Sequence, residues 1–255
     1  MIPDPVRDSL YRIGAIARHN TIIRRRDPGQ MIAYLFMPMI LMVVLKPLYI
    51  RAVPGGTTQV VTGLLVMFSV FALGIAGNAI LVERNWQTWD RLRQTRASSA
   101  EMLIGKTIPL FVFMFIQQTL LFVYGCLVIG LPVPHSLGLV VLAIVVWAFA
   151  LLAIGAALAT IARSSGELSM VSDIGALVLS SLGGALVPLS IVPGWAQGAA
   201  HASPGYWALA MIKSAVRDNV SGVLVPAAVL MGLGLVAGTF AVRRLTHGFG
   251  RARML

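Results

Sequence analysis

Apolar and charged residues are segregated along this chain into long apolar runs and short charged clusters. The run at 107–162 contains no Asp, Glu, Lys or Arg. A helix that crosses the hydrocarbon core of a bilayer, about 30 Å thick, needs about 20 apolar residues at 1.5 Å per residue. The run therefore predicts two membrane spans, at 107–129 and 137–162, separated by a turn at 130–136 that contains Gly and Pro.

The same criterion predicts four further spans, which gives six in all. Asp27 as an N-cap and Pro28 at the first helical position mark the start of a span at 28–48. The other three are predicted at 60–82, 168–190 and 221–242. Between the last two, closely spaced prolines leave no room for another complete span. Residues 191–219 are therefore predicted to form a broken, re-entrant external segment, which a membrane tolerates only where protein or water covers the backbone.

A different pattern precedes the first span. Apolar side chains recur there at helical spacing among charged positions, at Val6, Leu10, Ile13 and Ala17. The pattern predicts an amphipathic helix over 5–26, within an interfacial segment at 1–26 that lies on the membrane surface. An ordinary solvated leader is the alternative.

The composition agrees with a membrane protein. Apolar residues make up 58% of the 255 residues, charged residues make up 11%, and the mean hydropathy is +0.85. This leaves too little polar surface to coat a water-soluble globule. The net charge of +11 comes from basic residues that flank the apolar runs, which indicates contact with the headgroups of membrane lipids and no binding of nucleic acid.

The basic residues are also divided unequally between the two sides of the membrane. Sixteen of the 20 Lys and Arg residues lie in the N-terminal segment, the loop at 83–106, the turn at 163 and the C-terminal tail. Because cytoplasmic loops carry the excess of Lys and Arg, both termini are predicted to be cytoplasmic. We thus expect an all-α membrane protein that forms one transmembrane domain over 1–255.

One segment loosely matches a nucleotide-binding motif. Residues 100–107 read AEMLIGKT, with Ala in place of the first Gly of a phosphate loop. Such a loop needs small residues after a buried strand, so that its amide groups converge on phosphate. Bulky residues after a polar loop do not meet that need. We therefore predict no nucleotide site in this chain, and we expect Lys106 to anchor a helix end at headgroup level.

Other catalytic patterns are absent from the sequence. It contains no HExxH or GxSxG motif, its four histidines are far apart, and its single cysteine, Cys126, allows no internal disulfide. We predict no catalytic, cofactor-binding or metal-binding residues. Asp173 is the one acidic residue well inside a predicted span. It is either a functional polar site within the membrane or a group hydrated from the nearby helix end.

The loop at 83–106 is the most informative charged segment. Its tryptophans follow a helical spacing, and opposite charges alternate around them. A short helix with an aromatic face and a charged face fits either a membrane-surface element or the docking face for a partner protein. The residues assigned to this docking role are Glu83, Arg84, Trp86, Trp89, Asp90, Arg91, Arg93 and Glu101.

The same loop resembles a segment of known proteins. The run ERNWQTWDRLRQTRASSAEMLIGK is similar to the segment after the second span in permease subunits of ABC type-2 exporters, which reads Glu-Arg-x-x-Gly-Thr, then Leu and Thr, then Glu-x-Leu-x-Gly-Lys. The chain departs from that pattern at Gln87, where the family has Gly, and at Ala97, where it often has Pro. The matching positions are Glu83, Arg84, Thr88, Leu92, Thr95, Glu101, Leu103, Gly105 and Lys106.

A second stretch resembles the segment after the fifth span of the same family. It reads GGALVPLSIVPGWAQGAAHASPGYWALAMIK. Among the family's members, the chain looks most like the drug-resistance branch that includes daunorubicin exporters. The matching positions are Gly184, Pro188, Leu189, Pro193, Trp195, Pro204 and Tyr206.

The resemblance implies a half-transporter in the cytoplasmic, or inner, membrane of a bacterium. Such a permease works with a second permease, identical or homologous, and with two copies of a cytoplasmic ABC ATPase that bind ATP and Mg. The loop at 83–106 would dock on the ATPase. The substrate path would run between the permeases along spans 1, 2 and 5, and the external segment would cover its outer side. The cargo would be an amphipathic drug, a natural product or a lipid-like molecule.

Other functions remain open at this point. Within the exporter class, the cargo could be a lipid-linked glycan. A proton-driven transporter would need several ionisable groups in its spans. An integral-membrane enzyme that acts on lipid would need a convergent cluster of acid, base or metal-binding groups.

Overall fold

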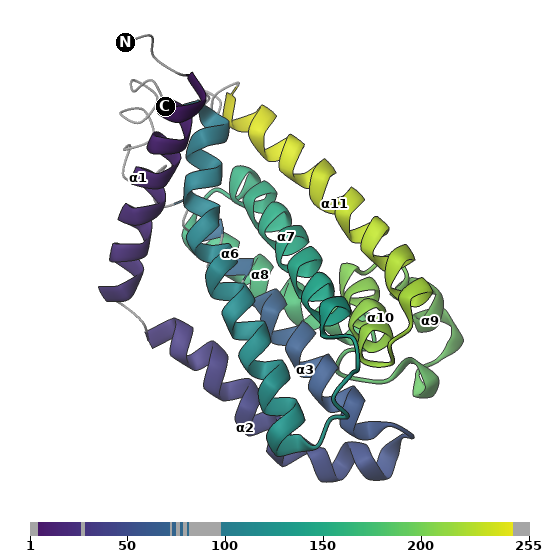
Figure 1. The fold of residues 1–255 in the computed structure, drawn as a ribbon. Helices are drawn as coiled ribbons and strands as arrows, with labels where there is room; N and C mark the ends of the chain where they lie inside the picture. Colours follow the sequence, from purple (N-terminus) through teal and green to yellow (C-terminus); the bar gives the residue numbers. More distant parts are fainter. Residues whose placement is uncertain are drawn as a thin grey trace.

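The fold is all-α, as the sequence predicts. The computed structural model describes residues 5–26, 29–71, 73–74, 77–78, 81 and 98–246. Those residues form nine α-helices and no strand (Figure 1). A π-helical turn, Gly125–Ile129, continues α6, and a 3-10 turn, Leu189–Ile191, precedes α9. The α-helices are α1 Pro5–Arg26, α2 Gly29–Ala52, α3 Gly56–Phe71, α6 Ser99–Tyr124, α7 Leu137–Ile161, α8 Ser165–Leu182, α9 Gly194–Ala200, α10 Pro204–Val216 and α11 Val220–Thr246.

Four helical segments among the described residues are long and apolar enough to cross a membrane. The other two predicted spans correspond to α3, which is apolar but shorter over its described part, and to α8, which is short and rich in serine. The predicted N-terminal helix coincides with α1, although whether α1 lies on a membrane surface stays a prediction. The four long segments are Ile32–Ala52, Ala100–Ile129, Leu137–Ile161 and Val220–Leu245.

The bundle has two ends, which we name after the helices found there. The α1 end holds α1, the start of α6 and the end of α11; the α9 end holds α9, the end of α2 and the start of α11 (Figure 1). Helix α11 packs along α7, and α1 packs beside α6. Helices α2 and α6 run toward the α9 end, whereas α7 and α11 run back toward the α1 end (Figure 1).

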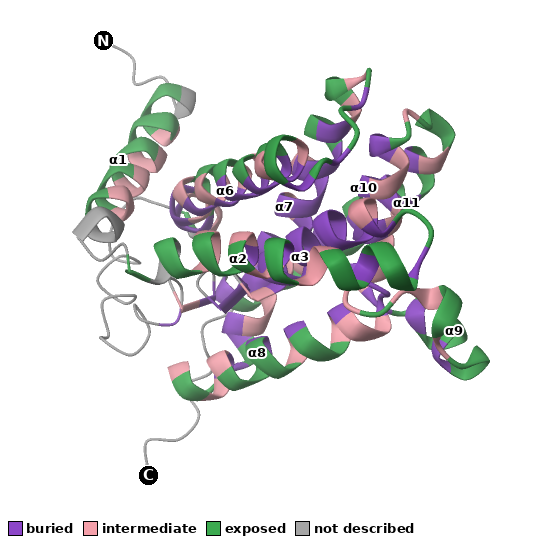
Figure 2. Ribbon diagram, turned by 90° about the horizontal axis from the view of Figure 1, so that it is seen from below, coloured by how far each residue is buried: buried purple, intermediate pink, exposed green. Residues whose placement is uncertain are grey.

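Helix α3 lies at the centre of the bundle, and residues 59–70 of it are all buried. Figure 2 shows buried segments gathered on α3 and α7, with exposed faces on α2 and α8. Trp147 of α7 is fully buried, and its indole N–H donates a 2.7 Å hydrogen bond to the hydroxyl of Ser69 in α3. A buried indole needs such a partner, so this bond helps to fix α7 against α3.

Pro38 removes one backbone hydrogen bond from α2. Proline has no amide hydrogen, so the carbonyl of Tyr34, four residues earlier, loses its helical donor. Gln117 of α6 replaces that donor, because its Nε2 donates to the Tyr34 oxygen at 2.9 Å. Since the membrane interior offers no water to an orphaned carbonyl, this bond ties α6 to the interruption in α2.

The start of α6 and the end of α8 differ most from the prediction. Helix α6 begins at Ser99 and not at 107, because Ser98 and Glu101 form a capping box that starts the helix earlier. Helix α8 ends at Leu182 and not at 190. Gly183 follows it, and Gly184 adopts a positive φ of 81°, a conformation that glycine reaches without strain. The chain therefore turns away from the helix axis before Pro188.

Side chains hold the α9 end together through backbone carbonyls. Gln59 of α3 donates its Nε2 hydrogen to the carbonyl of Gly184 at 2.8 Å, and its oxygen accepts a hydrogen bond from Nζ of Lys213 in α10. The hydroxyl of Ser203 donates to the carbonyl of Leu179, near the end of α8, at 2.7 Å. The Gln59 bond joins the segment after α8 to α3, and the Ser203 bond joins the residues before α10 to α8. Both carbonyls lie near the end of α8, where the regular hydrogen bonds of the helix stop.

The turn at 130–136 is non-helical, as predicted, and Asp218 fixes it to the start of α11. The carboxylate of Asp218 accepts the backbone N–H groups of Ser136 at 2.7 Å and His135 at 3.0 Å. These two donors stabilise the charged form and lower the pKa of Asp218 below its ordinary value.

The role given to Gln117 can be tested with a double-mutant cycle. Gln117→Leu should lower the free energy of unfolding by about 1–2 kcal/mol, because the Tyr34 carbonyl loses its donor in apolar surroundings. In a Pro38→Ala background the alanine amide becomes the helical donor, so the same substitution should have a much smaller effect. Unfolding of the purified full chain in detergent measures both changes.

Gln118 provides the matched control. It is fully buried, and neither its side-chain nitrogen nor its oxygen has a hydrogen-bond partner among the described residues. Gln118→Leu should therefore be neutral or stabilising, since it removes unsatisfied polar atoms. Equal losses from Gln117→Leu with and without Pro38 would contradict this account.

Candidate functional site

Of the residues predicted to couple the chain to a partner, the structure describes Glu101. It places Glu101 in the first turn of α6, at the α1 end. The other members of the set lie outside the described residues, so their role stays a prediction. They are Glu83, Arg84, Trp86, Trp89, Asp90, Arg91 and Arg93.

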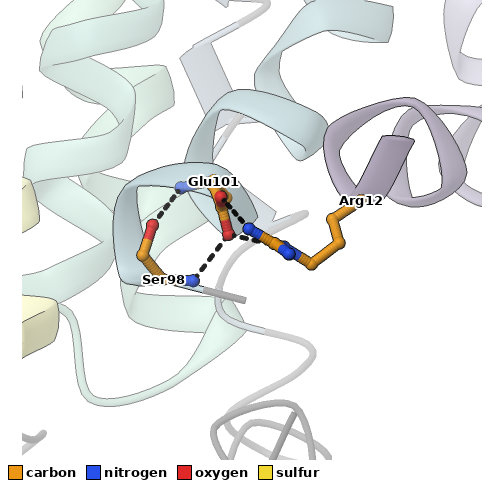
Figure 3. Close-up of polar contacts among 3 residues, drawn as sticks. All are labelled: Arg12, Ser98 and Glu101. Atoms are coloured by element: carbon orange, nitrogen blue, oxygen red, sulfur yellow. Dashed lines mark hydrogen bonds and ion pairs between the residues drawn. The ribbon is translucent and has the colours of Figure 1, made fainter. Parts of the chain in front are cut away.

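Glu101 joins the start of α6 to α1. The hydroxyl of Ser98 accepts the N–H of Glu101 at 3.1 Å, and the Glu101 carboxylate accepts the N–H of Ser98 at 2.8 Å. The same carboxylate binds Arg12 of α1 through both oxygens, with Nη2 at 2.7 Å and Nε at 3.1 Å (Figure 3). This bidentate geometry fixes the relative orientation of the two helices, which a single point contact would not do.

Gly105 brings the two helices close together one turn further on. A Cβ atom at this position would lie 2.9 Å from Cβ of Ile16 and 3.0 Å from the carbonyl oxygen of Ile13. Any larger side chain would therefore push α1 away from α6. Leu10, in contrast, is 64% exposed, so α1 keeps an apolar side chain free of the bundle. We call these contacts of Arg12, Ser98, Glu101 and Gly105 the α1–α6 junction.

The structure corrects the prediction for Lys106. Its side chain is 2% exposed and is among the largest fully buried side chains of the described residues, so it is enclosed by protein and does not reach out to lipid headgroups. The prediction fails because several helices pack around the first turns of α6 and enclose the side chain.

The same region excludes a phosphate loop. Residues 100–107 are helical, and the amides of Glu101 and Met102 already donate to the hydroxyl and the carbonyl of Ser98. They are not free to converge on a phosphate. Within the described part of the chain, no three His, Cys, Asp or Glu side chains gather as ligands for a metal ion would.

Asp173 lies on the exposed side of α8. Its neighbours on that side are apolar, with Met170 57% exposed and Ile174 55% exposed. The opposite face of α8 packs against α3, and Ser172 on that face is buried beside Gly74, which follows α3 in the sequence. The carboxylate therefore belongs to a face that the described part of the chain leaves uncovered.

Sequence reasoning missed two residues of the α1–α6 junction. The Ser-x-x-Glu spacing from Ser98 to Glu101 is the signature of a capping box, and it would have placed the start of α6 correctly. No local signal identifies Arg12 as the partner of Glu101, because the two residues are 89 positions apart in the sequence.

The junction predicts a specific change in the mobility of α1. Arg12→Ala should raise the hydrogen-exchange rates of the α1 amides several-fold, because α1 loses its ionic contact with α6. Gly105→Leu should have the same effect by displacing Ile16. Arg18→Ala is the control, since it removes the same charge from an exposed position of the same helix. Equal exchange in Arg12→Ala and Arg18→Ala would show that the ion pair does not hold α1.

Comparison with known proteins supplies the family. A comparison with curated proteins found no match. A family model described as ABC-2 type transporter matches residues 11–216, from within α1 to the end of α10. The match spans most of the 255 residues and includes the α1–α6 junction. The chain therefore belongs to the ABC-2 type transporter family, as a multi-pass membrane permease component without the ATPase.

Proposed function

We propose that this permease is one half of an ATP-driven exporter that moves an amphipathic drug, a natural product or a lipid-like molecule out across the cytoplasmic membrane of a bacterium. ABC-2 permeases typically pair with an ABC ATPase. In this proposal, two ATPase copies bind ATP and Mg, and a second permease, identical or homologous, completes the path. A lipid-linked glycan is the alternative cargo.

The observation that carries the proposal is the α1–α6 junction. The predicted docking segment, 83–106, includes the start of α6, whose first turn is capped by Ser98 and held to α1 by Arg12. A force applied to the loop by an ATPase would therefore act on α1 and α6 together and not simply fray the end of α6. The junction suits the transmission of ATPase closure into the membrane domain.

The exposed side of α8 supports a path between two permeases. A charged side chain that faces lipid is costly, by about 2.5–3.5 kcal/mol near the centre of a bilayer. Asp173 is exposed between apolar side chains of α8. We infer that this side of α8 faces water in the path or the second permease. Helix α2 has a long exposed apolar face as well, and α3 packs against both helices.

The proposed topology has six spans and two cytoplasmic termini. Its spans are α2, the predicted span at 60–82 to which α3 belongs, and then α6, α7, α8 and α11. The α1 end then faces the cytoplasm, and residues 191–219 form the re-entrant external segment. Helix α10 supports this arrangement, because its 13 residues extend about 20 Å and are too short to cross a core of about 30 Å. It is also packed against α3, α7 and α11, as a covered re-entrant helix must be.

The proposal predicts that the loop at 83–106 docks on the ATPase. Trp89→Ala should weaken the association of permease and ATPase by about 30-fold, which corresponds to about 2 kcal/mol for a buried aromatic anchor. Reversal of Arg91 and Arg93 to Glu should act in the same direction. Co-purification of the complex in detergent, with the substrate-stimulated ATPase rate as a second readout, measures the change.

Trp195→Ala is the matched control for that experiment. Trp195 is 73% exposed and belongs to α9, at the opposite end of the bundle, so its removal should leave the association unchanged. The permease alone should not bind ATP. Full recovery of the ATPase with both the Trp89 and the double-arginine variants would refute the docking role.

A further inference from the structure

An apolar groove lies on the surface of the bundle between α6, α7 and α11. It has a volume of about 590 Å³. Small residues of α7 and α11 are part of its lining: Gly238 of α11 faces Ala153 of α7, and Gly234 packs against the ring of Phe149. Its rim carries longer apolar side chains that are partly exposed, among them Ile108 of α6. A narrow molecule could therefore lie along the groove in contact with three helices.

The groove offers almost nothing to a polar ligand. Two threonines line it, but both hydroxyls are already bonded to their own helices: Thr107 donates to the carbonyl of Leu103 at 2.9 Å, and Thr239 donates to that of Val236 at 3.0 Å. Their methyl groups are left to form the wall. The groove thus fits a hydrocarbon chain and does not fit a polar cargo.

Charge appears at one end of the groove. Arg243, in the last turn of α11, is the one charged residue among the described residues that line it. Arg244 follows, and its guanidinium lies 5.9 Å from the centre of the Phe240 ring. The occupant should therefore combine an apolar chain with a negative group at the α1 end.

The length of the groove fits one leaflet of a bilayer. From Gly234 to Arg243, α11 rises about 14 Å at 1.5 Å per residue. Half of a hydrocarbon core of about 30 Å is about 15 Å. A chain that starts beside Arg243 would therefore end near the middle of the membrane, and its headgroup would lie at the level of the α1 end.

We propose that the groove is a binding site for an anionic phospholipid, with one acyl chain along Gly234, Gly238 and Ala153 and the phosphate beside Arg243. This lipid is a resident of the permease and not its cargo. The groove is formed by α6, α7 and α11, whereas the proposed substrate path runs along α2, α3 and α8, and α8 lies along a different edge of the bundle (Figure 2). The inference therefore stands independently of the exporter proposal.

The site can be tested on the purified full chain by native mass spectrometry, with phosphatidylglycerol and phosphatidylcholine titrated separately. Gly238→Leu fills the groove. Its Cβ would lie 3.8 Å from Cβ of Ala153, an ordinary contact, so the packing of α11 on α7 should survive. Gly232→Leu is the matched control, because Gly232 is exposed and nothing lies within 4 Å of its Cβ position.

The wild-type chain and Gly232→Leu should each retain one phosphatidylglycerol, and Gly238→Leu should lower its occupancy at least about fivefold. Arg243→Gln tests the headgroup without touching the groove floor: it should reduce the preference for phosphatidylglycerol over phosphatidylcholine about fivefold, the effect of one basic residue near anionic lipid.

Three results would overturn the proposal. Equal binding of the two lipids by the wild-type chain would remove the anionic requirement. Unchanged occupancy in Gly238→Leu would place the lipid elsewhere. A wild-type dimer that dissociates on Gly238→Leu, without bound lipid, would assign the groove to a second copy of the chain.

Discussion

Backbone hydrogen bonding where no water is available is the constraint on which the rest of this structure depends. Inside a membrane each carbonyl that loses its helical donor must find another within the protein. Pro38 removes one backbone donor from α2, and α8 ends just before Gly184. At both places a glutamine from another helix donates to a backbone carbonyl. Near the end of α8, the hydroxyl of Ser203 is a second donor to the carbonyl of Leu179, which also accepts the amide of Gly183. These bonds also set which helices are neighbours, because each one joins segments far apart in the sequence.

The sequence predicted the elements that depend on local pattern. The amphipathic spacing gave α1 its bounds, and the charge-free run placed α7 and the turn before it. It also predicted that the chain lacks an ATPase site, and the family match confirms this. The predicted start of α6 is eight residues too late, because the capping box of Ser98 and Glu101 lies within the charged segment that was assigned to the loop. It could not predict that Lys106 is buried, since burial of that side chain depends on helices that are distant in sequence.

The candidate site was only partly predictable for the same reason. Glu101 could be assigned from its loop, but its partner Arg12 comes from a different helix and follows no motif. Asp173 was recognisable as an acidic residue in an apolar segment, whereas its exposed position on α8 required the packing of α8 against α3. The bundle thus has two functional sides in our account: α8 and α2 face the proposed path, and α6, α7 and α11 hold the lipid groove. The α1–α6 junction lies at the end where both sides meet the proposed cytoplasmic surface.

The central claim of this account is that the α1 end faces the cytoplasm and the α9 end faces outward. Single cysteines at two exposed positions, Arg18→Cys in α1 and Trp195→Cys in α9, test it in a Cys126→Ser background. With a membrane-impermeant thiol reagent added to intact cells, the account predicts labelling at position 195 and none at position 18 until the membrane is opened. Labelling of position 18 in intact cells, or of both positions from the same side, would contradict it.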